Sequence, residues 1–515
     1  MDRKWIFILV LLLILVNISL RAARINSESP PLTNDFRNVA PYKDEGAKAH
    51  EARNRALFGS WNPHPADNYL FWSTQSPVWT WSLYFVFKIF GVSYASLRSV
   101  SIFFSAVTLA AGSFILYKGG HRVAAVLFPL VLGLNFYYLI FTRLGLMEPM
   151  MIAYSTICAG FLAWSRKRPA MLVLASLFLL AAIFTKVTAA LIVPIWLLMA
   201  GVNLYPALRT ANPKRAIVVS AAAVIVILVL AGAVLVSSDL REVLVYNLRH
   251  GLNITGGFTL DLVLGRAWEV VKSFFPGRLY NNYFLLLPIS SVMGTGWIVY
   301  AGYRLFRGKR VSDLELVLLA WFVIGRIVVS STPHRVVRFH LFYFVPIAMM
   351  ATMALDKLWN SNTGRTPKRT AAVLVMAVGL IISLVPLGKW AMHPRYDMVQ
   401  ASRKLGEVLK KEEKFLGTEP VVIGEWVGPL SIENQMRCHY IKGPFNGSRE
   451  QTAAFGITHL LESTTRYDPA VGRFKKQWPR VYKRRELVAE FEVRRRHLKL
   501  WRIPPVSEYY YVPSF

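Results

Sequence analysis

Two adjacent carboxylates, Asp44 and Glu45, lie in the first long polar segment of the chain. The apolar run Trp5–Leu20 precedes them and is long enough to cross a hydrocarbon core, so the pair is expected just outside a membrane. A carboxylate within hydrogen-bond reach of an acceptor hydroxyl can take its proton as the hydroxyl attacks. The residues alone leave two interpretations open. One is chemistry at the membrane surface, and the other is compensation of a helix dipole at a helix start.

The composition predicts the elements that must position this pair. Hydrophobic residues make up 54% of the 515 residues and occur in continuous blocks, which indicates an all-α polytopic membrane protein. About eleven transmembrane helices are predicted from runs of this length. They are Trp5–Leu20, Leu97–Tyr117, Val123–Phe141, Pro149–Trp164, Ala170–Thr185, Thr188–Leu204, Ala216–Val236, Tyr283–Tyr303, Leu314–Ser330, Phe339–Leu355 and Ala371–Leu387.

The short loops rich in Lys and Arg predict the orientation, because such loops remain cytoplasmic. With alternating spans, the basic loops all fall on one side: Asp2–Lys4, Lys118–Arg122, Arg166–Arg168, Arg209–Arg215, Arg304–Arg310 and Lys357–Arg369. The carboxylate pair and the tail from Gly388 then lie outside. No convincing small-x-small cleavage site follows the first span, so we expect it to be retained rather than removed as a signal peptide. The expected location is the plasma (inner) membrane, with an extracytoplasmic active site.

The net charge of +31 needs no nucleic acid as a partner. Much of it lies in the cytoplasmic loops, where it meets anionic membrane lipids. A second share lies in the tail, at Arg473–Lys476, Lys483–Arg485 and Arg494–Arg496. That share is either a solvated basic face or a surface that attracts an anionic glycan or lipid acceptor. Cys158 and Cys438 lie too far apart in the predicted topology to form a disulfide or a cysteine-based zinc site.

Two domains are predicted: a transmembrane domain over 1–389, with an outer loop at 21–96, and an extracytoplasmic domain over 390–515. The outer loop is expected to carry an amphipathic helix over Lys43–Phe58 and a helix lying at the interface over Val78–Phe90, which is short for a span. The tail has the pattern of a small α/β domain. Its expected elements are a helix over Ala401–Glu413, strands at Pro420–Gly424 and Thr458–Glu462, and a strand pair over Leu487–Arg502.

Four motifs, in order, resemble those of the GT-C membrane glycosyltransferases, most closely the protein O-mannosyltransferase and aminoarabinose transferase branches. The likeness covers most of residues 1–390. It comprises Asp44-Glu45-Gly46 with Ser76-Pro77-Val78-Trp79 and Phe90-Gly91-Val92-Ser93, then Arg143-Leu144-Gly145-Leu146-Met147-Glu148, then Phe184-Thr185-Lys186, and finally Ser331–Pro346.

The resemblance implies transfer of a sugar from a polyprenyl-phosphate carrier to an acceptor hydroxyl, with inversion at the anomeric carbon. The acceptor would be a protein, a lipid or a glycan. By its place in the motif Asp44 would be the base, with Glu45 as a catalytic helper and Glu148 as a supporting acid; alternatively, Glu45 simply orients the loop. The cations expected around the donor phosphate are Arg143, Lys186, Arg335 and Arg338. Alternatively, Arg143 and Arg338 are interface anchors.

No cofactor follows from the residues, but a divalent metal held by Asp44 and Glu148 stays open. His64, His334 and His340 are expected to be structural or interfacial. The chain departs from the family pattern at three points: Gln75-Ser76-Pro77 in place of Lys-Pro-Pro, Glu148 in place of Asp, and Val187 in place of Gly. A different class remains as the alternative, a polytopic transporter or flippase of lipid-linked sugars, which would carry charged groups inside several spans.

Overall fold

The computed structural model describes most of the chain. The described residues are 2–28, 40–67, 70–209, 213–236, 241, 265, 268, 271–272, 286–331, 337–360, 365–441, 447–464, 468–493 and 496–506. Two compact units emerge. The helical unit comprises Met1–Ala23, Ser101–Arg143 and Met147–Lys389, and the mixed unit comprises Arg24–Val100, Leu144–Leu146 and Trp390–Phe515.

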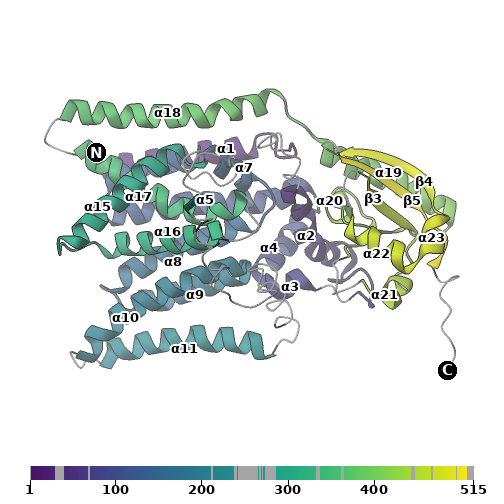
Figure 1. The fold of residues 1–515 in the computed structure, drawn as a ribbon, viewed down its shortest axis with the longest axis horizontal. Helices are drawn as coiled ribbons and strands as arrows, with labels where there is room; N and C mark the ends of the chain where they lie inside the picture. The colour runs from purple at the N-terminus through teal and green to yellow at the C-terminus, as the bar shows by residue number, and fades with distance from the viewer. Residues whose placement is uncertain are drawn as a thin grey trace. The chain divides into compact units, whose positions relative to one another are not determined.

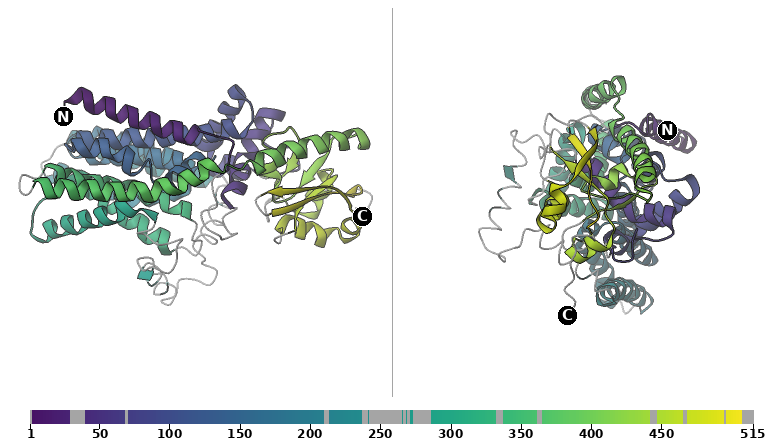
Figure 2. Two further views of the ribbon diagram at one scale, coloured as in Figure 1. Left: turned by 90° about the horizontal axis from the view of Figure 1, so that it is seen from above. Right: turned by 90° about the vertical axis from the view of Figure 1, so that its right-hand side faces the viewer.

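Long apolar helices make up the helical unit, and their axes run side by side in Figure 1 and again in Figure 2. The pairs α8 with α9 and α15 with α17 pack along one another. The helices are α1 (Arg3–Ala22), most of α5 (Tyr94–Lys118), α6 (Arg122–Val131), α7 (Phe136–Arg143), α8 (Glu148–Ser165), α9 (Ala170–Thr185), η2 (Val187–Ile192), α10 (Val193–Arg209), α11 (Pro213–Val236), α15 (Pro288–Phe306), α16 (Asp313–Ser331), η3 (Val337–His340), α17 (Leu341–Asn360) and α18 (Arg365–Met392).

Every predicted span overlaps a helix, but the predicted number of membrane crossings is not confirmed. Among the described residues, five helices are long and apolar enough to cross a membrane, or six if one bent pair counts as a span. The five are Arg3–Ala22, Tyr94–Lys118, Val187–Tyr205, Val337–Asn360 and Arg369–Met392. The protein is therefore a multi-helix membrane protein.

The span predicted over Val123–Phe141 is not one continuous helix. This segment forms two helices, α6 and α7, bent by 68° at the break between them. Within α1, Arg21 is buried and donates to the carbonyl oxygen of Gly133 in the break, at 3.0 Å. Its Nε also donates to Thr142 Oγ1 in α7, at 2.9 Å. Because the freed backbone carbonyl has a partner, the break is tolerated among apolar helices.

The mixed unit joins the first polar segment to the tail. The segment forms α2 (Ala40–Phe58), α3 (Phe71–Gln75) and α4 (Pro77–Phe90), so the predicted helices are present at both places. Arg53 of α2 is buried and donates to the carbonyl oxygens of Ser431 and Met436, each at 2.9 Å. These hydrogen bonds tie the segment to the tail. The division into functional domains at 389 and 390 stays a prediction.

The tail is a small α/β structure, as predicted. Its sheet has the order β2-β1-β3-β5-β4, in which β1 is parallel to β2 and β3, and the β3–β5–β4 part is antiparallel. The amphipathic α19, labelled in Figure 1, packs against β4. The elements are α19 (Asp397–Leu416), β1 (Val421–Ile423), α20 (Val427–Leu430), β2 (Arg437–His439), α21 (Arg449–Ala454), β3 (His459–Ser463), α22 (Pro469–Gln477), α23 (Pro479–Lys483), β4 (Glu486–Val493) and β5 (Arg496–Arg502).

Candidate functional site

Within the helical unit, three helix ends bring three predicted site residues together. Glu148 is the first residue of α8, where a negative side chain complements the helix dipole. Lys186 directly follows α9 in an extended conformation, before η2 begins. Arg338 lies in η3, just before α17. These three residues are far apart in the sequence. The packing of the helices brings them together.

The contacts among these side chains are close. Lys186 Nζ lies 2.5 Å from Glu148 Oε1, and Arg338 Nε lies 3.4 Å from the same oxygen. Both cations also lie near the ring of Phe339, at 4.7 Å for Lys186 Nζ and 5.4 Å for Arg338 Cζ. Glu148 and Arg338 are buried, and Lys186 is largely so. We call these three residues the Glu148 cluster.

The Glu148 cluster places two cations beside one carboxylate at helix ends with little solvent. Groups with little solvent interact strongly with a neighbouring charge. The two cations suit an anionic group such as a phosphate, because Arg offers bidentate contact and Lys a point charge.

The other two predicted phosphate ligands, Arg143 and Arg335, are not among the three residues that define the Glu148 cluster. Arg143 ends α7 and is buried, and it approaches the carbonyl oxygens of Arg21 and Ala23 at 3.5 and 3.4 Å. These distances exceed those of a strong hydrogen bond. Arg335 and His334 lie outside the described residues.

In the mixed unit, the two adjacent carboxylates of α2 have different surroundings. Asp44 is partly exposed, with 25% of its side chain accessible, and its Oδ2 lies 4.0 Å from Lys48 Nζ. Glu45 is fully buried and forms a bidentate ion pair with Arg98, with both N–O distances at 2.9 Å. Glu45 Oε1 also accepts the backbone N–H of Gly145 at 2.7 Å. Asp44 is therefore the carboxylate of the pair that solvent can reach.

Gly46 completes the motif by allowing a close helix approach. A Cβ at this position would lie 2.1 Å from the backbone nitrogen of Pro429 in α20. No side chain fits there, because real Cβ atoms do not come so close to a backbone atom. The sequence Asp44-Glu45-Gly46 thus combines an accessible acid, a buried anchor and a packing contact.

A third carboxylate follows on α2. Glu51 is buried and accepts the backbone N–H groups of Trp72 and Ser73, at 2.7 and 2.6 Å, where α3 begins. Burial raises the pKa of Glu51 to about 7, against the opposing effect of these hydrogen bonds. It fixes α3 against α2.

Sequence reasoning missed several buried cations. Arg98 was not recognised, because a single Arg after a loop resembles an interface anchor. Arg326 lies within α16 and donates to Tyr343 Oη at 2.7 Å, and the same oxygen lies 2.6 Å from His340 Nδ1. The signal for Arg326 was a lone charge inside an apolar run, which is rare in lipid. The predicted structural role of His340 agrees with this network.

Metal ligands do not gather in the described part of the chain. No group of three or more His, Cys, Asp or Glu side chains there could hold an ion.

The fold of this chain is similar to those of two solved membrane glycosyltransferases. ArnT from Cupriavidus metallidurans, bound to undecaprenyl phosphate, matches with a TM-score of 0.59 at 12% identity, over 97% of this chain and 98% of that one. The Archaeoglobus fulgidus oligosaccharyltransferase tethered with an acceptor peptide matches with a TM-score of 0.58 at 13% identity, over 90% and 69% of the two chains.

These structures have the GT-C fold, and so does this chain, as the motifs predicted. At such low identity the likeness shows the fold alone. Other structures of the archaeal enzyme AglB contain a dolichol-phosphate with an inhibitory peptide, or Zn and sulfate. No family model matches the sequence, and no curated protein does.

Proposed function

We propose that this protein is an inverting glycosyltransferase that moves a sugar from a polyprenyl-phosphate donor to an acceptor hydroxyl at the outer face of the membrane. The observation that carries the proposal is the Glu148 cluster, in which two cations and a carboxylate meet at three helix ends of a GT-C fold. The neighbouring structures that hold polyprenyl phosphates support the donor class. The proposal covers both hexosyl and pentosyl donors.

Asp44 is assigned as the general base. Its carboxylate takes the proton of the acceptor hydroxyl as that oxygen bonds to the anomeric carbon. The bond from this carbon to the phosphate oxygen breaks on the opposite face, and the electron pair leaves on the polyprenyl phosphate. Partial exposure of Asp44 leaves it accessible to an acceptor.

Lys186 and Arg338 are assigned to the leaving phosphate. Charge grows on that group as the bond breaks, and fixed cations in a site with little water stabilise it. Glu148 is assigned as their positioning carboxylate, since its Oε1 contacts both. Arg143 and Arg335 stay candidate phosphate ligands.

The test uses purified protein, a polyprenyl-phosphate sugar and extracted membrane acceptors, with product formation followed by mass spectrometry. Asp44→Asn should fold normally and lose about 100-fold or more in turnover, the usual contribution of a general base. Glu407→Gln is the matched control, because Glu407 is an exposed acid of α19. Full turnover in Asp44→Asn would exclude the assignment.

A second arm tests the phosphate site. Lys186→Gln should weaken binding of polyprenyl phosphate itself by about tenfold, the usual effect of one lost charge-assisted hydrogen bond. Lys389→Gln, an exposed lysine near the end of α18, should leave it unchanged. Flux of lipid-linked sugar across vesicles with no new glycosidic bond would instead support the transporter alternative.

A further inference from the structure

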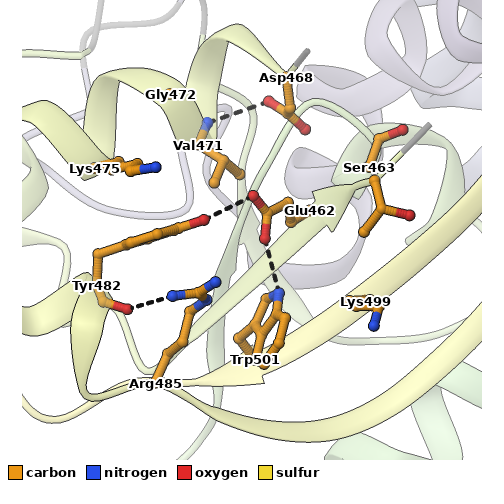
Figure 3. A pocket seen from close by; sticks show the side chains of 11 residues that line it. Glu462, Ser463, Asp468, Val471, Gly472, Lys475, Tyr482, Arg485, Lys499 and Trp501 are labelled. Carbon is orange, nitrogen blue, oxygen red and sulfur yellow. Dashed lines mark hydrogen bonds between the residues drawn. The ribbon is translucent and has the colours of Figure 1, made fainter. Parts of the chain in front are cut away.

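A cavity of about 460 Å³ lies in the tail, within the mixed unit (Figure 3). Its size is in the range that holds one or two sugar rings or a similar small molecule. Strands β3 and β5 form part of its wall, α22 and α23 form another, and Arg485 precedes β4. None of its lining residues belongs to the motifs assigned above.

A carboxylate and two aromatic rings give this cavity a fixed wall. Glu462 accepts hydrogen bonds from Tyr482 Oη at 2.8 Å and from Trp501 Nε1 at 2.9 Å (Figure 3). Arg485 Cζ lies 3.8 Å from the centre of the Tyr482 ring and 4.4 Å from that of Trp501. Because both rings are anchored at their polar ends, the guanidinium between them is held in place before any ligand arrives.

Two cations of the cavity have no acidic partner among the described residues. Arg485 Nη1 donates to the carbonyl oxygen of Tyr482 at 2.8 Å, whereas its buried Nε makes no hydrogen bond to the described part of the chain. Lys475 is exposed and lies 5.2 Å from the Tyr482 ring centre, without an ion pair. In contrast, Lys499 pairs with Glu490 at 2.8 Å.

The hydroxyl of Ser463 also has no hydrogen-bond partner among the described residues. Ser463 is buried and lines the cavity. A buried polar atom without a partner costs about 1–3 kcal/mol. The two carboxylates of the cavity are already engaged, since Glu462 holds the rings and Asp468 accepts the N–H groups of Ala470 and Val471 as the cap of α22. Within the described part of the chain, the cavity therefore lacks an anionic hydrogen-bond acceptor for Arg485 and Lys475, and a hydrogen-bond partner for the Ser463 hydroxyl.

We propose that this cavity binds an anionic saccharide, a sugar bearing a carboxylate or phosphate group. The anionic group contacts Arg485 Nε and Lys475, and a sugar hydroxyl contacts Ser463 Oγ. The cavity is larger than an inorganic anion needs, which favours a group carried on a sugar. The choice of a sugar rests on the proposed glycosyltransferase function, and the cavity would serve as a recognition site for a glycan outside the reacting centre.

Binding is tested by calorimetry on the full chain in detergent, without any donor lipid. The probes are glucuronate, glucose 1-phosphate, glucose and inorganic phosphate. We expect one or both anionic sugars to bind at least about tenfold more tightly than glucose or inorganic phosphate, since a charge-assisted contact is lost in glucose and the sugar contacts are lost in phosphate. Equal affinity for glucose, or tighter binding of inorganic phosphate, would overturn the proposal.

Lys475 and Lys476 provide a matched pair of variants, because both are exposed lysines of α22 and only Lys475 lines the cavity. Lys475→Gln should weaken binding about tenfold, Ser463→Ala a few-fold, and Lys476→Gln not at all. Arg485→Gln should abolish binding, and where it fails to fold Lys475→Gln carries the test. Equal losses in the two lysine variants would contradict the proposal.

The two proposals fail separately. Asp44→Asn should lose transfer and still bind the anionic sugar, because Asp44 is not part of the cavity. Wild-type protein that transfers sugar but binds no anionic saccharide would overturn the cavity assignment alone. If the wild-type protein bound the anionic saccharide but transferred no sugar, the cavity assignment would stand and the glycosyltransferase proposal would be rejected.

Discussion

At the scale of single residues, the adjacent acids Asp44 and Glu45 lie in different environments. Glu45 is enclosed by Arg98 and the N–H of Gly145, while Asp44 reaches solvent. A sequence shows two acids in a row but not which one points into the protein. The acid pair could therefore be identified from the sequence, whereas the partner Arg98, 53 residues away in the chain, could not.

The buried ion pair predicts a difference in stability between the two positions. Glu45→Ala leaves the Arg98 guanidinium buried without its carboxylate, which should lower the free energy of unfolding by about 3–5 kcal/mol. Asp44→Asn should leave it almost unchanged. Thermal unfolding of both variants in the same detergent measures this. If the Glu45→Ala protein were as stable as the wild type, the assignment of Glu45 as a structural anchor would be wrong.

Glu51 predicts a pH dependence of stability. Burial raises the pKa of Glu51 to about 7 in the folded protein, against about 4.3 for an unfolded chain. The folded carboxyl holds its proton more tightly, so its contribution to stability is full below pH ~4.3 and is lost as the pH rises through about 7. Glu51→Gln cannot ionise, so its stability relative to wild type should rise between pH ~5 and ~8, by up to about 3 kcal/mol.

Melting temperatures of both proteins across this pH range check the Glu51 prediction. Nearby His50 titrates in the opposite sense, because burial lowers its pKa to about 3 and its contribution to stability is lost as the pH falls below about 6.5. His50 is present in both proteins, so the difference between them isolates Glu51. A difference that does not change with pH would contradict the prediction.

At the scale of elements, apolar run length located the helices well but not their breaks. All the predicted spans overlap helices, since a long apolar run in a membrane has few other stable forms. The bend between α6 and α7 was missed because its partner, Arg21, lies in α1. Likewise, the break at Lys186 was visible as a charge between two apolar runs, while its contact with Glu148 depends on how α8 and α9 pack.

The approach of α2 to α20 gives a prediction at this scale. Gly46→Ala would push a Cβ against the Pro429 backbone at 2.1 Å, so the helices must separate. The variant should unfold at a clearly lower temperature, by an amount typical of an overpacked core, about 1–3 kcal/mol or more. Gly388→Ala is the control, because nothing lies within 4 Å of a Cβ there and the helix α18 should gain slightly in stability. Equal melting of the two variants would show that α2 can move freely.

At the scale of the whole molecule, the orientation in the membrane rests on the distribution of Lys and Arg among the loops. It predicts that the tail lies outside and the loop around Lys309 inside. Both native cysteines are buried, so a thiol reagent that cannot cross membranes should label the unaltered protein weakly. Lys476 and Lys309 are both exposed, and each can be replaced by Cys as a matched pair.

In intact cells, the reagent should label Lys476→Cys at once and Lys309→Cys only after the membrane is made permeable. This result would place the α/β tail on the side where a lipid-linked sugar meets an extracytoplasmic acceptor. Labelling in the reverse order would contradict the predicted orientation and place any transfer reaction at the cytoplasmic face. The residue assignments would survive such a reversal, because the ion pairs of Glu148 and Glu45 do not depend on which side faces the cytoplasm.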